Sequence, residues 1–341
     1  MNRRQFLPLI PAVAALSAQT TSGLKLGIDL FSIRSQGWTP FEYLDYCARW
    51  GAKVVHFSEI RFLGTLAPDN LRKVRAHAEK LGIQIEIGMR SICPTSKMFD
   101  PTAGTAEEQL GRMIQSAAIA GSKIVRAVLG SMEDRATRPI EEHIENTARV
   151  LRAVRTRAVD ADIKIAIENH AGDMQGRELK MLIEEAGKDF VGACLDSGNP
   201  LWTIEDPHVT LETLHPYVLT SHIRDSAVWA VPAGAAVEWV RMGEGNVGIE
   251  DYVRKYAALC PGRAISLEII VMGPRIFPYR DPKFWERYRN VRAWEFERFR
   301  ALAENGKPRP DISAAPKEQQ ASREREDLEA SLTFTKKLLG V

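Results

Sequence analysis

Three features are scarce in this sequence of 341 residues: paired cysteines, an excess of charge of one sign, and long apolar runs. The four cysteines, Cys47, Cys93, Cys194 and Cys260, lie far apart and form no CxxC pair. This spacing argues against a disulfide scaffold or a thiolate zinc site and predicts four buried thiols. Because 46 Lys and Arg residues face 44 Asp and Glu residues, for a net charge of +2, the composition does not favour binding to a polyanion.

The first residues differ from the rest of the chain. Arg3 and Arg4 precede Phe6 and Leu7, an apolar run to residue 16 and then small residues. A basic start, a short apolar run and a small-residue exit predict a signal peptide over residues 1–20, of the twin-arginine type that exports folded proteins. A Sec-type signal or an N-terminal anchor is the alternative. Since no other apolar run reaches the roughly 18 residues of a membrane span, we expect an exported, periplasmic protein with no membrane segment in its mature form.

Apolar runs and amphipathic stretches alternate along the remaining chain. We expect eight strands, rich in Val, Ile and Leu, at 24–30, 53–57, 83–88, 123–129, 163–168, 190–196, 218–223 and 264–270. Amphipathic helices are predicted between them, at 40–50, 68–81, 105–120, 140–159, 177–186, 205–214 and 249–259. Eight strand–helix units in about 250 residues predict an α/β protein in which residues 24–272 form a (β/α)8 TIM barrel. A doubly wound parallel sheet is the alternative.

Two segments fall outside this alternation. Residues 226–248 are predicted as a long loop at the top of the barrel, where Trp229, Trp239 and Met242 would shape a substrate pocket. Residues 273–341 are predicted as a C-terminal helical extension with several aromatic side chains: Phe284, Trp285, Tyr288, Trp294, Phe296 and Phe299. Aromatic residues at helical spacing are typical of a packing face. A ligand cage or a subunit contact in a homo-oligomer is the alternative.

Ionisable side chains end the last four predicted strands. They are Glu168, Asp196, His222 and Glu268. The active site of a (β/α)8 barrel lies at the carboxyl ends of its strands, and an ionisable group in an apolar strand costs several kcal/mol unless it is paired or bound to a metal. Three carboxylates and one imidazole suit one divalent metal ion, such as Mn, Mg, Co or Zn. The pattern therefore predicts a metal centre, with ion pairing as the alternative.

Polar residues near the same strand ends are candidates for substrate binding. His170 lies two residues beyond Glu168, and Arg224 lies two beyond His222, so each shares a strand face with a predicted ligand. The further candidates lie in or after the second, fourth and sixth strands: His56, Glu59, Arg126 and Asn199. The alternatives are an ion pair with Asp225 for Arg224, an Asx-type turn for Asn199, and structural contacts or buried salt bridges for the others.

These strand-end motifs resemble a known family. Four segments are similar to those of xylose isomerase-like sugar isomerases and epimerases over roughly residues 24–271: Glu168-Asn169, Asp196-Ser197-Gly198-Asn199, His222-Ile223-Arg224-Asp225 and the lone Glu268. The resemblance implies that the four predicted ligands hold one divalent metal. It also implies that Glu168 and Glu268 flank the substrate carbon as acid and base, in a metal-dependent isomerase or epimerase whose partner is a small sugar.

The chemistry of such a site leaves three functions open. A metal that chelates a carbonyl and its neighbouring hydroxyl stabilises an enediolate, and a carboxylate on each face can remove a proton and return one. Return of the proton gives an isomerase or epimerase on a free or keto sugar, whereas loss of a leaving group gives a dehydratase or β-eliminase on a keto-glycoside or inosose. A non-catalytic sugar-binding barrel is the third possibility. Export favours an unphosphorylated substrate, since sugar phosphates are mainly cytoplasmic.

Charge disfavours two other interpretations. Residues 243–248 match G-x-G-x-x-G before a helix, but Glu244, Glu250 and Asp251 place negative charge where the pyrophosphate of a dinucleotide would bind. We therefore expect no dinucleotide cofactor. The ligand set also resembles endonuclease IV, a DNA-repair enzyme, but Asn199 stands where that branch adds a histidine, and the net charge is near neutral. We expect no nucleic-acid partner.

Overall fold

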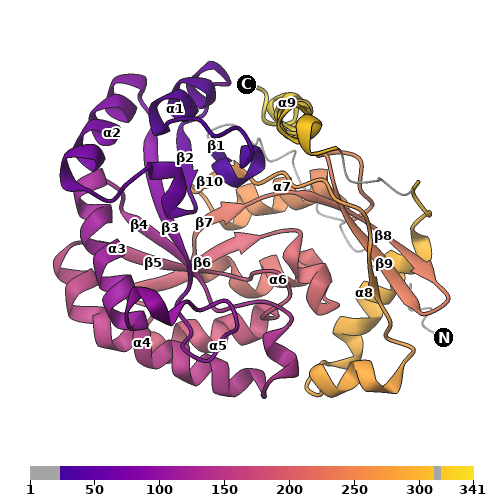
Figure 1. Ribbon diagram of the computed structural model, residues 1–341. Helices are drawn as coiled ribbons and strands as arrows, with labels where there is room; N and C mark the ends of the chain where they lie inside the picture. Colours follow the sequence, from indigo (N-terminus) through magenta and orange to yellow (C-terminus); the bar gives the residue numbers. More distant parts are fainter. Residues whose placement is uncertain (1–23, 311–315) are drawn as a thin grey trace, which may run out of the picture.

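A (β/α)8 barrel forms the larger part of the structure, a computed structural model that describes residues 24–310 and 316–341 (Figure 1). Eight parallel strands follow one another around the barrel: β1 (Lys25–Asp29), β2 (Val54–Phe57), β3 (Gln84–Ser91), β4 (Ile124–Val128), β5 (Lys164–Glu168), β6 (Val191–Asp196), β7 (Val218–His222) and β10 (Ala264–Leu267). β10 pairs with β1, and a parallel bridge between Ile223 and Leu267 joins the last two edges. The predicted barrel is confirmed. The predicted signal peptide at residues 1–20 lies outside the described residues.

Helices cover the outside of the barrel between these strands. They are α1 (Pro40–Arg49), α2 (Pro68–Leu81), α3 (Ala106–Ala120), α4 (Ile140–Asp160), α5 (Gly176–Ala186), α6 (Pro207–Leu214) and α7 (Ile249–Leu259). α1 and α3 begin with capping boxes, in which Thr39 pairs with Glu42 and Thr105 pairs with Glu108. Each such cap contributes about 1 kcal/mol to helix stability. These local signals explain why the predicted helices agree closely with the observed ones.

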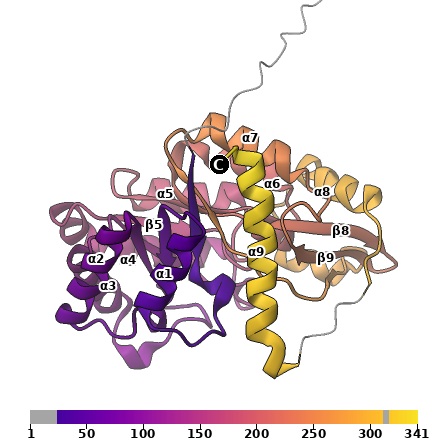
Figure 2. The same cartoon turned by 90° about the horizontal axis from the view of Figure 1, so that it is seen from above.

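Residues 226–248 form a β hairpin rather than the predicted loop. Three antiparallel strands build a small second sheet: β8 (Asp225–Val231), β9 (Gly234–Val240) and β11 (Arg275–Phe277). This sheet projects from the barrel beside α8 (Ala293–Asn305) (Figures 1 and 2). The sequence did not reveal the hairpin because its two-residue turn, Pro232-Ala233, lacks the Asn-Gly or Asp-Gly pair that usually marks one.

The aromatic side chains of the C-terminal extension pack against the small sheet. α8 and the short helix η7 (Pro282–Arg287) contribute to a second hydrophobic core. Its aromatic members are Trp202, Trp239, Phe277, Tyr279, Phe284, Trp285, Tyr288, Phe296 and Phe299. Five of the six predicted aromatics therefore lie on a packing face, and Trp294 is the exception, with 51% of its surface exposed.

The last helix of the chain returns to the barrel. α9 (Gln320–Leu339) lies beside α1 and α7 (Figures 1 and 2), in the position of an eighth barrel helix. Its buried residues Leu328, Leu332 and Leu339 belong to the main core. Residues 273–341 therefore serve two structures, because the first part completes the small sheet and the last part covers the barrel. Within residues 24–310 and 316–341, the helices are too short or too polar to cross a bilayer.

Candidate metal centre and substrate cavity

The four predicted ligands meet at one end of the barrel. Glu168, Asp196 and His222 are the last residues of β5, β6 and β7, and Glu268 directly follows β10. Because the strands are parallel, their carboxyl ends lie at the same rim. Each residue offers one ligand atom, and these four atoms lie within 4.8 Å of one another. The side chains are buried, with at most 5% of each residue exposed.

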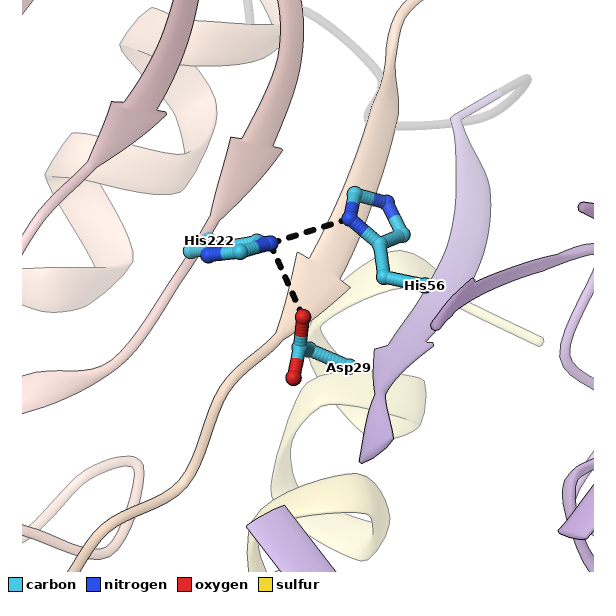
Figure 3. A group of neighbouring side chains, drawn as sticks. All are labelled: Asp29, His56 and His222. Atoms are coloured by element: carbon cyan, nitrogen blue, oxygen red, sulfur yellow. Dashed lines mark hydrogen bonds and ion pairs between the residues drawn. The ribbon is translucent and has the colours of Figure 1, made fainter. Parts of the chain in front are cut away.

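The two nitrogens of the His222 ring have different surroundings. Nδ1 lies 2.9 Å from Oε2 of Glu168 and 3.5 Å from Oε2 of Glu268, and it has no hydrogen-bond partner among the described residues. Nε2 lies 3.1 Å from Oδ2 of Asp29 and 2.9 Å from Nδ1 of His56 (Figure 3). A histidine that binds a metal through one nitrogen commonly directs the other at a carboxylate. His222 has this arrangement.

The donor set fits a divalent cation. Three carboxylates and one imidazole nitrogen are oxygen and nitrogen ligands of the kind that Mn, Mg, Co and Zn accept. The buried Nδ1 of His222 lacks a hydrogen-bond partner in the described chain, as expected for a nitrogen that binds a metal. Glu168, Asp196, His222 and Glu268 would hold the ion.

Two buried arginines balance the carboxylates. Nε of Arg126 donates to Oε2 of Glu168 at 2.6 Å. Burial raises the pKa of Glu168, but the charge of Arg126 is the largest of the effects that outweigh burial and lower this pKa well below its usual range. Arg224 contacts the carboxylates of Asp196 and Glu268. Arg224 therefore forms ion pairs, as the alternative expected, but its partners are Asp196 and Glu268 and not Asp225.

A cavity of about 300 Å³ opens beside the metal ligands. It is lined by Phe31, Ser58, Glu59, Arg90, Met98, Arg126, Val128, His170, Ala171, Asn199, Trp202, Arg224, Trp239, Glu268 and Ile270. All of the predicted substrate-binding residues lie on its wall except His56. The ring of His56 is instead buried behind His222, and its Nε2 lies 3.1 Å from Oε2 of Glu86.

His170 presents one nitrogen to the cavity in a defined protonation state. Its Nδ1 donates to the carbonyl oxygen of Gly130 at 2.7 Å. Burial lowers the pKa of His170 to about 4, so the imidazole is neutral at pH 7. Nε2 is then an acceptor, suited to a substrate hydroxyl.

Four side chains form a continuous stack next to the cavity. The rings of Trp202 and Trp239 lie parallel, with centroids 4.3 Å apart and an interplanar angle of 7°. The guanidinium of Arg224 lies 4.4 Å from the Trp239 ring, and that of Arg275 lies 4.1 Å from the Trp202 ring. Each tryptophan ring is therefore covered on both sides, which fixes its plane, and each guanidinium is held against one ring. Trp239 comes from the hairpin, so the small sheet supports a side chain of the barrel site.

The glycine motif at residues 243–248 binds a carboxylate of its own chain. The N–H groups of Gly243 and Gly245 both donate to Oδ2 of Asp225, at 3.0 and 2.9 Å. A Cβ atom at Gly245 would lie 2.2 Å from Oδ1 of Asp225, so a larger residue would prevent this approach. The motif therefore holds the base of the hairpin.

Several residues of the site were not predicted. Asp29 ends β1 as the four ligands end their strands, and the same strand-end argument could have identified it. Arg90 lies near the end of β3, where an exposed arginine is unremarkable in sequence. Trp202 lies in the short 3-10 helix η5 (Asn199–Thr203), which follows β6. Its role depends on the hairpin, which was not predicted and which places Trp239 against it.

Comparisons with known proteins agree with the barrel. A family model described as xylose isomerase-like TIM barrel matches residues 44–288. The 3-oxo-isoapionate decarboxylase of Pectobacterium atrosepticum is 26% identical over 184 residues, or 54% of this chain and 60% of that protein, so the match spans about three fifths of this curated relative. A structure of D-psicose 3-epimerase with D-fructose has a TM-score of 0.61 at 14% identity, covering 93% of this chain and 100% of that chain. IolI protein with a bound zinc atom has a TM-score of 0.58 at 14% identity, covering 93% and 98%.

Proposed function

The chain belongs to the xylose isomerase-like TIM barrel family, and we propose that it is a divalent-metal-dependent enzyme that isomerises or epimerises a keto sugar through an enediolate. One observation carries the proposal: four metal-ligand side chains converge from consecutive positions around the barrel, next to a cavity of monosaccharide size. The zinc atom of the IolI structure and the sugar epimerase among the similar structures are consistent with it.

The residues of the site have distinct tasks in this proposal. Glu268 lies on the cavity wall and exchanges a proton with the substrate carbon on one face. Glu168, which Arg126 holds as a carboxylate, serves the other face. His170 and Asn199 bind substrate hydroxyls. Glu168, Asp196, His222 and Glu268 would hold a divalent ion, which would supply positive charge to stabilise the enediolate.

Decarboxylation is a second candidate, favoured by the relative that is named 3-oxo-isoapionate decarboxylase. Loss of carbon dioxide from a 3-oxo acid leaves an electron pair that the neighbouring carbonyl delocalises, and the same metal and acid groups would stabilise and protonate the product. Dehydration or β-elimination would proceed from the enediolate proposed for isomerisation, with loss of a leaving group from the neighbouring carbon. Product masses distinguish the three outcomes, because isomerisation conserves mass whereas the others lose carbon dioxide or a leaving group.

The test combines metal analysis with hydrogen exchange. We expect the purified protein to bind one divalent ion and to incorporate solvent deuterium at carbon in at least one member of a panel of keto sugars and oxo acids in D2O. Glu168→Gln and Glu268→Gln should each reduce the exchange rate by about 100-fold or more. The control is Glu205→Gln, which changes a buried glutamate that is neither a metal ligand nor on the cavity wall. A protein that binds no divalent ion, or that is unaffected by both ligand substitutions, contradicts the proposal.

We also propose that residues 1–20 direct export of the folded protein, which would then meet unphosphorylated sugars outside the cytoplasm. The proposal rests on Arg3 and Arg4 before the apolar run. Replacing both arginines with lysine should leave the protein in the cytoplasmic fraction, whereas the parent should be recovered outside it. Equal export of both forms would favour a Sec-type signal, and retention of both would contradict export.

A further inference from the structure

The wall of the cavity is rich in guanidinium groups. Arg90, Arg126 and Arg224 line it, and its acidic lining residues are Glu59 and Glu268. These carboxylates are already neutralised, because Glu59 pairs with Arg61 and Glu268 pairs with Arg224. Arg126 and Arg224 likewise have acidic partners.

Arg90 is the cation that remains. It is exposed, and within residues 24–310 and 316–341 it forms neither a hydrogen bond nor an ion pair. Hydrogen bonds from Thr102 are the main cause that lowers the pKa of Asp100, and the charge of Arg90 lowers it further. Arg90 and Asp100 nevertheless form no ion pair. A guanidinium without a partner on the wall of a concave site attracts an anion and can hold a carboxylate through charge-assisted hydrogen bonds.

Buried donors on the same wall also lack partners. Arg224 is only 2% exposed, yet its Nε and Nη1 have no hydrogen-bond partner in the described chain, and neither does Nε1 of Trp239. Asn199 contributes one unpaired acceptor, Oδ1. A buried donor without a partner costs about 1–3 kcal/mol. The site is therefore suited to a ligand with more acceptors than donors, which describes an oxidised sugar better than a polyol.

We propose that the substrate is a keto sugar acid, with its carboxylate bound by Arg90 and its oxo group directed towards Glu268. This inference rests on the proposed function and adds the substrate class. β3, which carries Arg90, and β10, which precedes Glu268, are separated by two strands, so the two groups can bind opposite ends of one molecule. A carboxylate matches one unpaired cation, whereas a phosphate carries a charge of about −1.5 to −2. The cavity wall also lacks lysine and the first turn of any described α-helix, which commonly bind phosphate.

Three ligands that differ only at carbon 6 test the proposal: D-fructose, D-fructuronate and D-fructose 6-phosphate. Their dissociation constants are measured by calorimetry on the metal-loaded protein. We expect D-fructuronate to bind at least about 10-fold more tightly than D-fructose, since a charge-assisted hydrogen bond contributes about 1.5–3 kcal/mol. Arg90→Gln should bring this ratio close to one. Arg72→Gln, which changes an exposed arginine on α2, should leave the ratio as in the parent.

The outcomes separate substrate class from function. Equal affinity for D-fructose and D-fructuronate, a preference that persists in Arg90→Gln, or failure of all three ligands to bind overturns the proposal. If D-fructose 6-phosphate binds most tightly of the three, the site recognises a phosphate and not a carboxylate, and the proposal is also wrong. Metal content and deuterium exchange with neutral keto sugars report the proposed function separately. A protein that binds metal and exchanges deuterium with neutral keto sugars, but does not prefer the acid, would disprove the proposed substrate class and leave the proposed function intact.

Discussion

At the scale of single residues, the two ring nitrogens of His222, one of the four predicted ligands, have different partners. Nδ1 faces the carboxylates of Glu168 and Glu268, while Nε2 faces Asp29. Asp29 is itself held in place, because its Oδ1 accepts hydrogen bonds from Oγ of Ser58 at 2.8 Å and from the N–H of Phe31 at 2.6 Å. With Nε2 donating its proton to Nδ1 of His56 and lying 3.1 Å from the charged Oδ2 of Asp29, Nδ1 of His222 is left free to bind a cation.

The Asp29→Asn variant tests this role. The amide can keep an oxygen towards Ser58 and the N–H of Phe31, but its NH2 group then opposes the N–H of His222. We expect the affinity for zinc to fall by about 10–100-fold, the usual effect of losing such a partner, as measured by competition with a chelator. The control is Asp45→Asn, which alters a half-buried Asp–His pair away from the site, with 2.7 Å between Oδ1 of Asp45 and Nε2 of His77. Unchanged affinity in Asp29→Asn would contradict the role.

A second residue, Glu205, makes stability depend on pH. Burial raises its pKa to about 7 from the usual value of 4.5 for a glutamate, although its Oε2 accepts hydrogen bonds from Thr210 and from the N–H of Gly176. Between these pH values the folded state keeps a proton that the unfolded state releases. Stability contributed by this group therefore falls as the pH rises from about 4.5 to 7.

Glu205→Gln should remove that part of the pH dependence, because an amide oxygen can accept the same two hydrogen bonds without titrating. We expect the melting temperature of the variant to change less than that of the parent across this pH range. Glu86, whose pKa burial also raises to about 7, is present in both proteins and cancels in the comparison. Parallel profiles for the two proteins would show that Glu205 titrates normally.

At the scale of elements, the hairpin matters because it carries Trp239 to the barrel site. Trp239 stacks between Trp202 and Arg224, whereas Trp229 on the partner strand packs with Ala227, Ala236 and Val240 in a separate cluster. The two tryptophans lie on one hairpin, but only Trp239 contacts residues of the barrel site. They therefore provide a matched pair for separating support of the site from stability of the hairpin.

We expect Trp239→Leu to lower kcat/KM by about 10-fold or more on the substrate found by deuterium exchange. The variant loses the surface that orients Arg224, and a loss of about 1.4 kcal/mol in the transition state corresponds to tenfold in rate. Trp229→Leu should lower the melting temperature about as much as Trp239→Leu does, while its kcat/KM stays within about twofold of the parent value. If both variants lose activity equally, the effect belongs to the hairpin as a whole.

The sequence predicts the barrel better than it predicts the site's supports. Strand periodicity and helix caps such as Thr39 and Thr105 are local signals, so the barrel elements agree with prediction to within a few residues. The four ligands were identified because each follows an apolar strand. The stack of Trp202 on Trp239 joins segments that are distant in sequence and depends on a hairpin without a typical turn, so no local pattern indicates it.

At the scale of the whole molecule, the chain leaves the barrel after β10 and returns only with α9. Between them, residues 273–310 complete the small sheet with the hairpin and contribute to the second hydrophobic core. α9 then contacts α1 and the segment between β9 and α7: Oη of Tyr46 on α1 donates to Oε1 of Glu329 at 3.0 Å, and the N–H of Met242 donates to Oγ of Ser331 at 3.2 Å. The end of the chain is therefore part of the barrel wall.

The stability of the barrel should consequently depend on α9, and Leu328→Ala tests this dependence. Leu328 is fully buried in the main core, and truncation of a buried leucine usually costs about 2–5 kcal/mol, because contacts are lost and a cavity remains. We expect a decrease of this size in the free energy of unfolding, measured by urea titration followed by circular dichroism. Val341→Ala, at the exposed end of the chain, should change it by less than about 0.5 kcal/mol. If α9 were only an appendage, Leu328→Ala would leave the main transition in place and add an early transition of small amplitude. A single cooperative transition shifted to lower urea would instead show that α9 unfolds together with the barrel.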